Sequence, residues 1–134
     1  MNISSPNIIS MGIDSIDIIR FKDWSKYNIN ILKKIFTQEE INYCLNIKTK
    51  SAERFAARFC AKEACYKALN ILTKTQINLF AFFKYIEIKK SSCGAPQISI
   101  NFTKIQLKDN IFINKILLSI THTKSTATAL VIVT

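Results

Sequence analysis

Two acidic side chains stand in apolar surroundings, where a carboxylate needs a partner. Asp14 lies in a strand-like apolar segment, and Glu63 lies in the middle of an alanine-rich segment with helical periodicity. Burying an unpaired carboxylate is costly. Together the two could hold a hard cation such as Mg²⁺, which proteins bind through one or two carboxylates, waters and substrate phosphates. Taken singly, Asp14 could instead cap the next helix or form a salt bridge at the end of a strand, and Glu63 could form a surface pair with Lys67.

Basic and hydroxyl side chains accompany this pair. Lys62 and Lys67 flank Glu63 on the same helical segment and could neutralise the phosphates of a metal-bound ligand. His122 is the sole histidine; it follows a strand-like run and sits among hydroxyl side chains. A lone histidine is more often a structural hydrogen bonder, but a place at a strand end favours a functional role.

The charge of the chain constrains its partners. Its 134 residues fit one domain, and we assign residues 1–134 to it, with residues 1–10 as an N-terminal extension. The formal charge of +10 suits nucleic acid, an acidic protein, an anionic membrane surface or a phosphorylated ligand, although biased genome composition would also produce it. The start of the chain lacks signal-peptide character, no run approaches the ~18 apolar residues of a membrane span, and the four cysteines form no C-x-x-C pair. We therefore expect a reduced, cytoplasmic protein with no membrane partner.

The first half of the chain has strong helix signals. Residues 13–19 are apolar with two acids and predict a strand that runs into a short helix. Thr37 and Glu40 have the spacing of a capping box, which predicts a helix through Cys44. The clearest helix spans about residues 51–69, which lack glycine and proline and carry an apolar stripe at helical spacing.

The second half predicts strands. From about Leu79 onward the sequence is strand-like, and residues 91–96 have the composition of a hairpin turn. The expected strands are residues 85–89, 97–101, 116–121 and 127–133. A strand, then helices, then antiparallel strands indicates an α+β fold, with a long helix packed on an antiparallel sheet.

Three segments in order and at the right spacing resemble a known family. Residues 12–21 are similar to a G-x-D-x-x-E-x-x-R-F pattern, with Asp17 at the position of the glutamate. Residues 57–69 are similar to an R-F-A-A-K-E-A-x-x-K-A-L helix, and residues 119–123 to an S-I-S/T-H segment; residues 36–40 fit the family's helix start. Over about residues 11–134 the chain resembles the holo-[acyl-carrier-protein] synthases, the small class of 4′-phosphopantetheinyl transferases.

This resemblance implies an enzyme of fatty acid biosynthesis. It would transfer 4′-phosphopantetheine from coenzyme A to a serine of an acidic apo-acyl carrier protein, with Mg²⁺, giving holo-carrier and 3′,5′-ADP. The family is trimeric, so the resemblance implies a homotrimer with active sites between neighbouring subunits. We expect no nucleic-acid partner for such an enzyme. The implied metal ligands are Asp14 and Glu63, and the implied catalytic residues are Asp14, Lys67 and His122. The implied coenzyme A contacts are Arg58, Lys62, Lys67, Gly94, Pro96, Thr121 and His122. The implied carrier contacts are Arg20, Phe21, Lys22 and Lys26.

The chain departs from the family pattern in the parts that surround the ligand. Cys60 replaces an alanine of the helix signature, and residues 70–74 replace a glycine-rich segment. Ala95 stands where the usual N-G-K-P turn has its lysine, so Lys89 or Lys90 would have to supply that charge.

The residues by themselves also allow two functions other than transferase activity. A basic RNA- or DNA-binding module would explain the charge and exposed aromatic residues such as Tyr85, but it would leave Asp14 and Glu63 facing phosphate without a metal. A carrier-binding protein without activity is a second alternative. For the transferase, the acceptor of the serine proton stays open between a metal-bound water, Asp14 and His122.

Overall fold

A computed structural model describes residues 7–134 of the chain. Residues 1–6, the larger part of the expected N-terminal extension, lie outside the described residues. The first strand, β1 (Ser10–Asp17), already begins at Ser10, which pairs with Val133.

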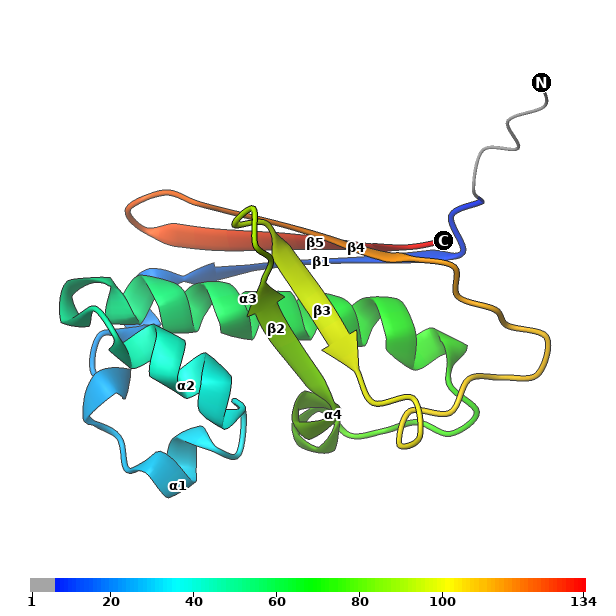
Figure 1. Ribbon diagram of the computed structural model, residues 1–134, viewed down its shortest axis with the longest axis horizontal. Helices are drawn as coiled ribbons and strands as arrows, with labels where there is room; N and C mark the ends of the chain where they lie inside the picture. The colour runs from blue at the N-terminus through cyan, green and yellow to red at the C-terminus, as the bar shows by residue number, and fades with distance from the viewer. Residues whose placement is uncertain (1–6) are drawn as a thin grey trace.

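The centre of the fold is one long helix against one antiparallel sheet. Helix α3 (Ser51–Leu69) packs along one face of a three-stranded sheet in the order β1-β5-β4, in which β5 is Thr126–Val133 and β4 is Ile116–His122 (Figure 1). This confirms the predicted α+β class, the predicted long helix and the predicted second strand pair. Because β5 lies between the other two strands, β1 and β4 form opposite edges of the sheet.

Small residues allow the helix and the sheet to approach closely. Ala127 and Ala129 of β5 are fully buried, as are Ala64 and Ala68 of α3. A Cβ atom at Gly12 would overlap the backbone oxygen of Ala64. Glycine is therefore required here, and it brings the middle of β1 directly onto α3.

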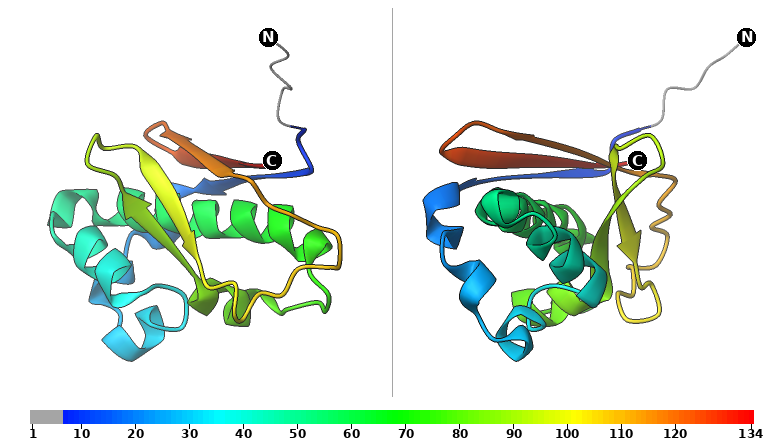
Figure 2. Two further views of the ribbon diagram at one scale, coloured as in Figure 1. Left: turned by 45° about the vertical axis from the view of Figure 1, so that its right-hand side comes forward. Right: turned by 60° about the vertical axis from the view of Figure 1, so that its left-hand side comes forward.

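A second layer covers the other sides of α3. The β2–β3 hairpin (Ile86–Lys90 and Pro96–Ile100) runs beside the β4 edge, and α2 (Gln38–Leu45) packs on α3 away from the sheet (Figure 2). The hairpin and the helix through Cys44 confirm the sequence prediction. Thr37 caps α2 as expected, since its side-chain oxygen accepts a hydrogen bond from the Glu40 amide at 3.2 Å. The short elements are α1 (Ile29–Leu32) and the 3-10 helices η1 (Ile18–Phe21), η2 (Trp24–Lys26), η3 (Lys48–Lys50) and η4 (Asn70–Leu72).

One predicted segment has a different structure. Residues 79–85 form helix α4 (Leu79–Tyr85) rather than the start of a strand. The Asn78 side chain caps this helix by accepting a hydrogen bond from the Ala81 amide at 2.9 Å, and Phe82 and Phe83 are fully buried. Tyr85, expected to be exposed, is half-buried. Aromatic-rich runs suit either structure, and here the cap and the burial of the two phenylalanines decide for a helix.

Side-chain hydrogen bonds order the loop that replaces the family's glycine-rich segment. The Thr73 hydroxyl lies 2.8 Å from the backbone oxygen of Asn70 and 2.9 Å from that of Thr75, and its one proton can be donated to either. The Asn70 side chain accepts from the Ile77 amide. Over residues 7–134, none of the helices is long and apolar enough to cross a membrane.

Candidate active site

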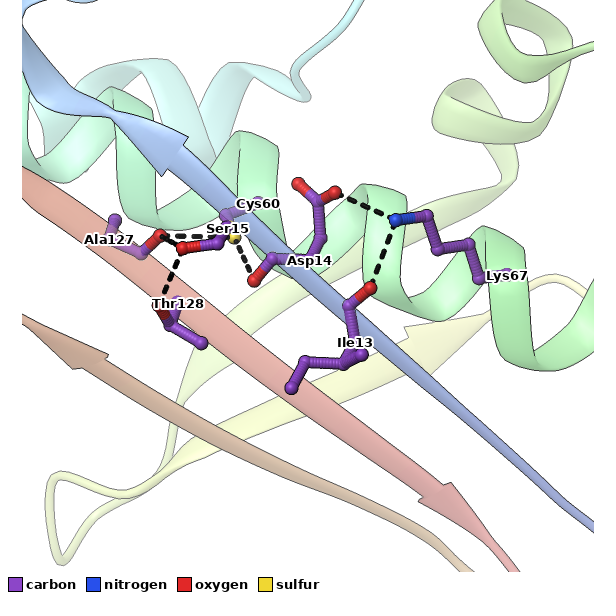
Figure 3. Close-up of polar contacts among 7 residues, drawn as sticks. All are labelled: Ile13, Asp14, Ser15, Cys60, Lys67, Ala127 and Thr128. Atoms are coloured by element: carbon purple, nitrogen blue, oxygen red, sulfur yellow. Dashed lines mark hydrogen bonds and ion pairs between the residues drawn. The ribbon is translucent and has the colours of Figure 1, made fainter.

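Asp14 faces α3 from the middle of β1. Even-numbered residues of β1 point toward the helix, so the Asp14 side chain is directed there, and it is only 11% exposed. Lys67 reaches it from α3: the Nζ atom lies 2.9 Å from Asp14 Oδ1 and 3.0 Å from the backbone oxygen of Ile13 (Figure 3). The surface-pair alternative required an ion pair between Lys67 and Glu63. In the structure, Lys67 forms its ion pair with Asp14 instead.

Glu63 and Asp14 form a pair of close carboxylates. Burial, followed by the nearby Asp14 carboxylate, raises the pKa of Glu63 to about 7. The second oxygen of Asp14, Oδ2, is buried without a hydrogen-bond partner. Two carboxylates that compete for one proton, one with an unsatisfied oxygen, fit a divalent cation. Residues 7–134 hold no cluster of three or more potential ligands, so waters or ligand phosphates would complete the coordination.

Cys60 lies beneath this pair, on the same face of α3. Its thiol donates to the backbone oxygen of Asp14 at 3.0 Å and lies 3.6 Å from that of Ala127 (Figure 3). The residue that departs from the family signature therefore links the helix to both β1 and β5. Burial raises the pKa of its thiol to about 12, which keeps it protonated as a hydrogen-bond donor.

A basic pocket of about 290 Å³ opens at the opposite edge of the sheet, between α3, the β2–β3 hairpin and β4. Its lining includes Tyr43, Glu53, Arg54, Arg58, Lys89, Lys90, Gly94, Pro96 and His122. The structure thus brings together four of the expected coenzyme A contacts, namely Arg58, Gly94, Pro96 and His122. Lys89 and Lys90 lie in the same wall, so they can supply the charge that Ala95 lacks. Gly94 has a φ of +88°, which favours glycine at this turn.

The pocket has an excess of positive charge. Across residues 7–134, no carboxylate oxygen lies within 4.0 Å of the charged groups of Arg54, Arg58 or Lys90. A neighbouring pocket of about 360 Å³ shares Arg58 and both lysines with the first. Cations without acidic partners around a cavity make a site for an anionic ligand.

Three residues of this pocket, Tyr43, Glu53 and Arg54, were not among the residues expected from the sequence. Glu53 Oε1 lies 3.0 Å from His122 Nε2, and both side chains are partly exposed. The Tyr43 ring packs against the guanidinium groups of Arg54 and Arg58. The available signal was the i, i+4 spacing of the two arginines, which marks a basic helix face that needs compensation.

Lys62 does not belong to either cluster, contrary to expectation. Its side chain is fully buried, 2.8 Å from Glu40 Oε1, and it donates to the backbone oxygens of Ile35 at 2.7 Å and Phe83 at 3.0 Å. All of its N–H groups have partners inside the protein. Burial lowers the pKa of Lys62 and raises that of Glu40, although each attracts the other. Lys62 is therefore a core ion-pair residue that cannot contact phosphate in this structure.

Two other expected positions lie away from the places expected for them. Phe21 is 2% exposed and packs on the rings of Trp24 and Phe59, so its side chain is buried in this structure. Thr121 is exposed but alternates with His122 along β4, so it points to the opposite face and does not line the pocket. The other expected carrier contacts, Arg20, Lys22 and Lys26, are exposed.

The two clusters lie at different edges of the molecule. Asp14 is on edge strand β1 and His122 is on edge strand β4, with β5 between them. On α3, Arg58 and Glu63 are five residues apart, which places them about 140° apart around the helix axis. A single chain therefore presents the carboxylate pair and the basic pocket as two separate surfaces.

Comparison with known proteins gives one consistent result. The family model of the 4′-phosphopantetheinyl transferase superfamily matches residues 10–130. A holo-[acyl-carrier-protein] synthase from Chlamydia caviae is 40% identical over 123 residues, which cover 91% of this chain and 93% of that protein. The structure of Helicobacter pylori holo-[acyl-carrier-protein] synthase in complex with coenzyme A matches with a TM-score of 0.71 and 30% identity over 92% of this chain and 99% of that one. The Bacillus anthracis holo-(acyl-carrier-protein) synthase complex with CoA (3′,5′-ADP) matches with a TM-score of 0.71 and 28% identity, over 94% and 96% of the two chains.

Proposed function

This chain belongs to the 4′-phosphopantetheinyl transferase superfamily, and from that premise we propose that it is a holo-[acyl-carrier-protein] synthase. It transfers 4′-phosphopantetheine from coenzyme A to a serine of apo-acyl carrier protein, for fatty acid biosynthesis, and releases 3′,5′-ADP. The main support is the basic pocket at the β4 edge, in which Arg54, Arg58 and Lys90 have no acidic partner among the described residues. Such a pocket suits the phosphates of coenzyme A, the ligand of the structurally similar Helicobacter pylori protein.

The carboxylate pair supplies the metal ligands of this proposal. Asp14 and Glu63 hold Mg²⁺, in keeping with the unsatisfied Oδ2 atom and the raised pKa of Glu63. When bound, the cation neutralises charge that develops on the pyrophosphate during phosphoryl transfer. Lys67 fixes the Asp14 carboxylate, and because its side chain is 53% exposed, its ammonium can also attract a phosphate oxygen.

The active site is shared between copies of the chain in a homotrimer. The sheet face opposite α3 carries apolar side chains, and no described element covers it (Figure 1). Met11, Ile13 and Leu117 on this face are 60%, 59% and 52% exposed. Packing copies through this face buries the apolar patch and brings the β1 edge of one copy to the β4 edge of the next. The carboxylate pair and the basic pocket then complete one site, which neither edge provides alone.

The carrier protein docks near the exposed cations of η1 and η2. Arg20, Lys22 and Lys26 are exposed there, and the chain carries a formal charge of +10. An acidic carrier would be attracted electrostatically to this surface.

Four cysteines without a disulfide fit a reducing, cytoplasmic compartment.

One assay tests the proposed reaction. The purified protein is incubated with coenzyme A, Mg²⁺ and an apo-acyl carrier protein, and the carrier is weighed by mass spectrometry. We expect the carrier to gain the mass of phosphopantetheine, and expect no gain when coenzyme A is omitted. An unchanged carrier mass, under conditions in which a known synthase modifies the same carrier, would refute the function.

A further inference from the structure

The side chain of Tyr43 on α2 organises the cations of the basic pocket. The centroid of its ring lies 4.1 Å from Arg54 Cζ and 3.8 Å from Arg58 Cζ, and Lys90 Nζ lies 5.9 Å away. Arg54 also donates a 2.7 Å hydrogen bond from Nη1 to the backbone oxygen of Tyr43. Tyr43 lines both of the adjoining pockets, so it is part of the wall between them.

The Tyr43 ring offsets the electrostatic repulsion between Arg54 and Arg58. Arg54 and Arg58 are four residues apart on α3, a spacing at which like charges repel. Arg58 is 8% exposed, and its Nε atom has no hydrogen-bond partner. An aromatic face attracts a guanidinium group without neutralising it. A carboxylate at the same place would also hold the arginines, but it would repel a phosphate from the pocket.

We propose that Tyr43 is a positioning residue for phosphate binding. It holds Arg58 and Arg54 in place, while the N–H groups of Arg58, and those of Arg54 that are not bonded to the Tyr43 backbone, stay free for the anion. This inference rests on the proposed function, because it takes the phosphates of coenzyme A and 3′,5′-ADP as the ligand. The aromatic ring, and not the phenolic hydroxyl, is the essential part of the side chain, since the contacts to both guanidinium groups are made to the ring.

Calorimetric titration of 3′,5′-ADP into the purified protein tests this role. We expect Tyr43→Leu to weaken binding about tenfold, within the range of a partly desolvated cation–π contact, and Tyr43→Phe to retain most of the affinity. The matched control is Tyr85→Leu, which removes a half-buried tyrosine that lines neither pocket. In the transfer assay, Tyr43→Leu should raise the KM for coenzyme A and leave kcat nearly unchanged, because ground-state and transition-state binding lose the same interaction.

A double-mutant cycle separates positioning from general support of the fold. If Tyr43 acts through the arginines, Tyr43→Leu should have a much smaller effect in an Arg58→Ala background than in the wild type. Thermal melting checks that each variant is folded, and Tyr43→Met, closer in volume, replaces Tyr43→Leu if that variant does not fold. Equal affinity of the wild type and the Tyr43 variants, or equal loss in Tyr43→Phe and Tyr43→Leu, would overturn the inference alone. A wild-type protein that neither binds 3′,5′-ADP nor transfers would overturn the proposed function as well.

Discussion

Lys67 Nζ lies 2.9 Å from Asp14 Oδ1 and therefore ties α3 to β1 directly beside Glu63. The hydrogen bond to Asp14 raises the pKa of Lys67, so its ammonium stays charged. The same carboxylate leaves its other oxygen, Oδ2, buried and unpaired. One oxygen of Asp14 is thus held by protein, and the other remains for a cation that Glu63 would share.

Glu63→Gln should abolish most of the activity, because it removes one of the two charged ligands proposed for the metal. We expect kcat/KM to fall on the order of 10²-fold or more, measured with coenzyme A and carrier at saturating Mg²⁺. In thermal melting, Mg²⁺ should raise the Tm of the wild type and not that of the variant. Asp109→Asn removes the same charge at an exposed loop and should leave both measurements unchanged. Wild-type transfer by a folded Glu63→Gln protein would contradict the metal role.

Lys62→Met should destabilise the fold. It leaves the buried Glu40 carboxylate without its partner, and removing one member of a buried ion pair typically costs about 3–5 kcal/mol. Urea denaturation measures the loss in the free energy of unfolding. Replacing both members, with Glu40→Gln added to Lys62→Met, should recover part of it. If the Lys62→Met protein has wild-type stability but a raised KM for coenzyme A, Lys62 contacts the substrate and its main role is not in the core.

Mixing two inactive variants should restore activity if the site is shared. Glu63→Gln keeps the basic pocket, and Arg58→Ala keeps the carboxylate pair. In randomly mixed trimers about a quarter of the sites would join the intact β1 edge of one copy to the intact β4 edge of another. We expect recovery toward that fraction of wild-type activity after the subunits are exchanged. As a control, neither single variant should rescue the double variant, Glu63→Gln with Arg58→Ala, to the same extent. If the mixture of the two single variants stays inactive, the whole site lies within one chain.

Arg20→Glu should weaken recognition of the carrier more than that of coenzyme A. The reversal places a negative charge on the exposed η1 surface, which would repel an acidic carrier. Steady-state kinetics should show a larger rise in the KM for the carrier, and added salt should slow the wild type, because exposed charges are screened beyond ~10 Å at 0.1 M salt. Lys108→Glu, the same reversal at a lysine far from η1 in sequence, serves as the control. Equal effects on both substrates would count against a docking surface at η1.

Cys93 should be the reactive cysteine of the native protein. Hydrogen bonds from Ser91 and from the turn backbone lower the pKa of its exposed thiol below the ordinary value, whereas burial raises the pKa of Cys44 and Cys65 to about 12. A lowered thiol pKa puts more thiolate in solution as the pH approaches 9 from below. Iodoacetamide at pH 8 should therefore add once, at Cys93, and Cys93→Ser should abolish the fast addition. A reaction midpoint at or above that of an unperturbed cysteine, about pH 8.5, would contradict these hydrogen bonds.

The sequence alone determined the parts of the fold that depend on local periodicity. The helix over residues 51–69 follows from an alanine-rich run with no glycine or proline, and the strand pairs follow from alternation and turn composition. The family resemblance pointed to Asp14 and Glu63 together, although they are 49 positions apart, because three similar segments follow one another in the right order and the helix segment with Glu63 is specific. The strand-like interpretation of residues 79–85 was wrong because their aromatic residues suit a strand or a helix. The helix cap and the burial in the core select the helix.

Tertiary structure decided which side chains on that helix face a ligand. Lys62 and Lys67 have the same chemistry, but they point about 140° apart on α3, and the packing of α2 and α4 encloses Lys62 with Glu40 while Lys67 stays open beside Asp14. The strand order β1-β5-β4 likewise placed Asp14 and His122 at opposite edges of the sheet. Burial and strand order arise from contacts between segments distant in the chain, and local sequence patterns carry no record of those contacts.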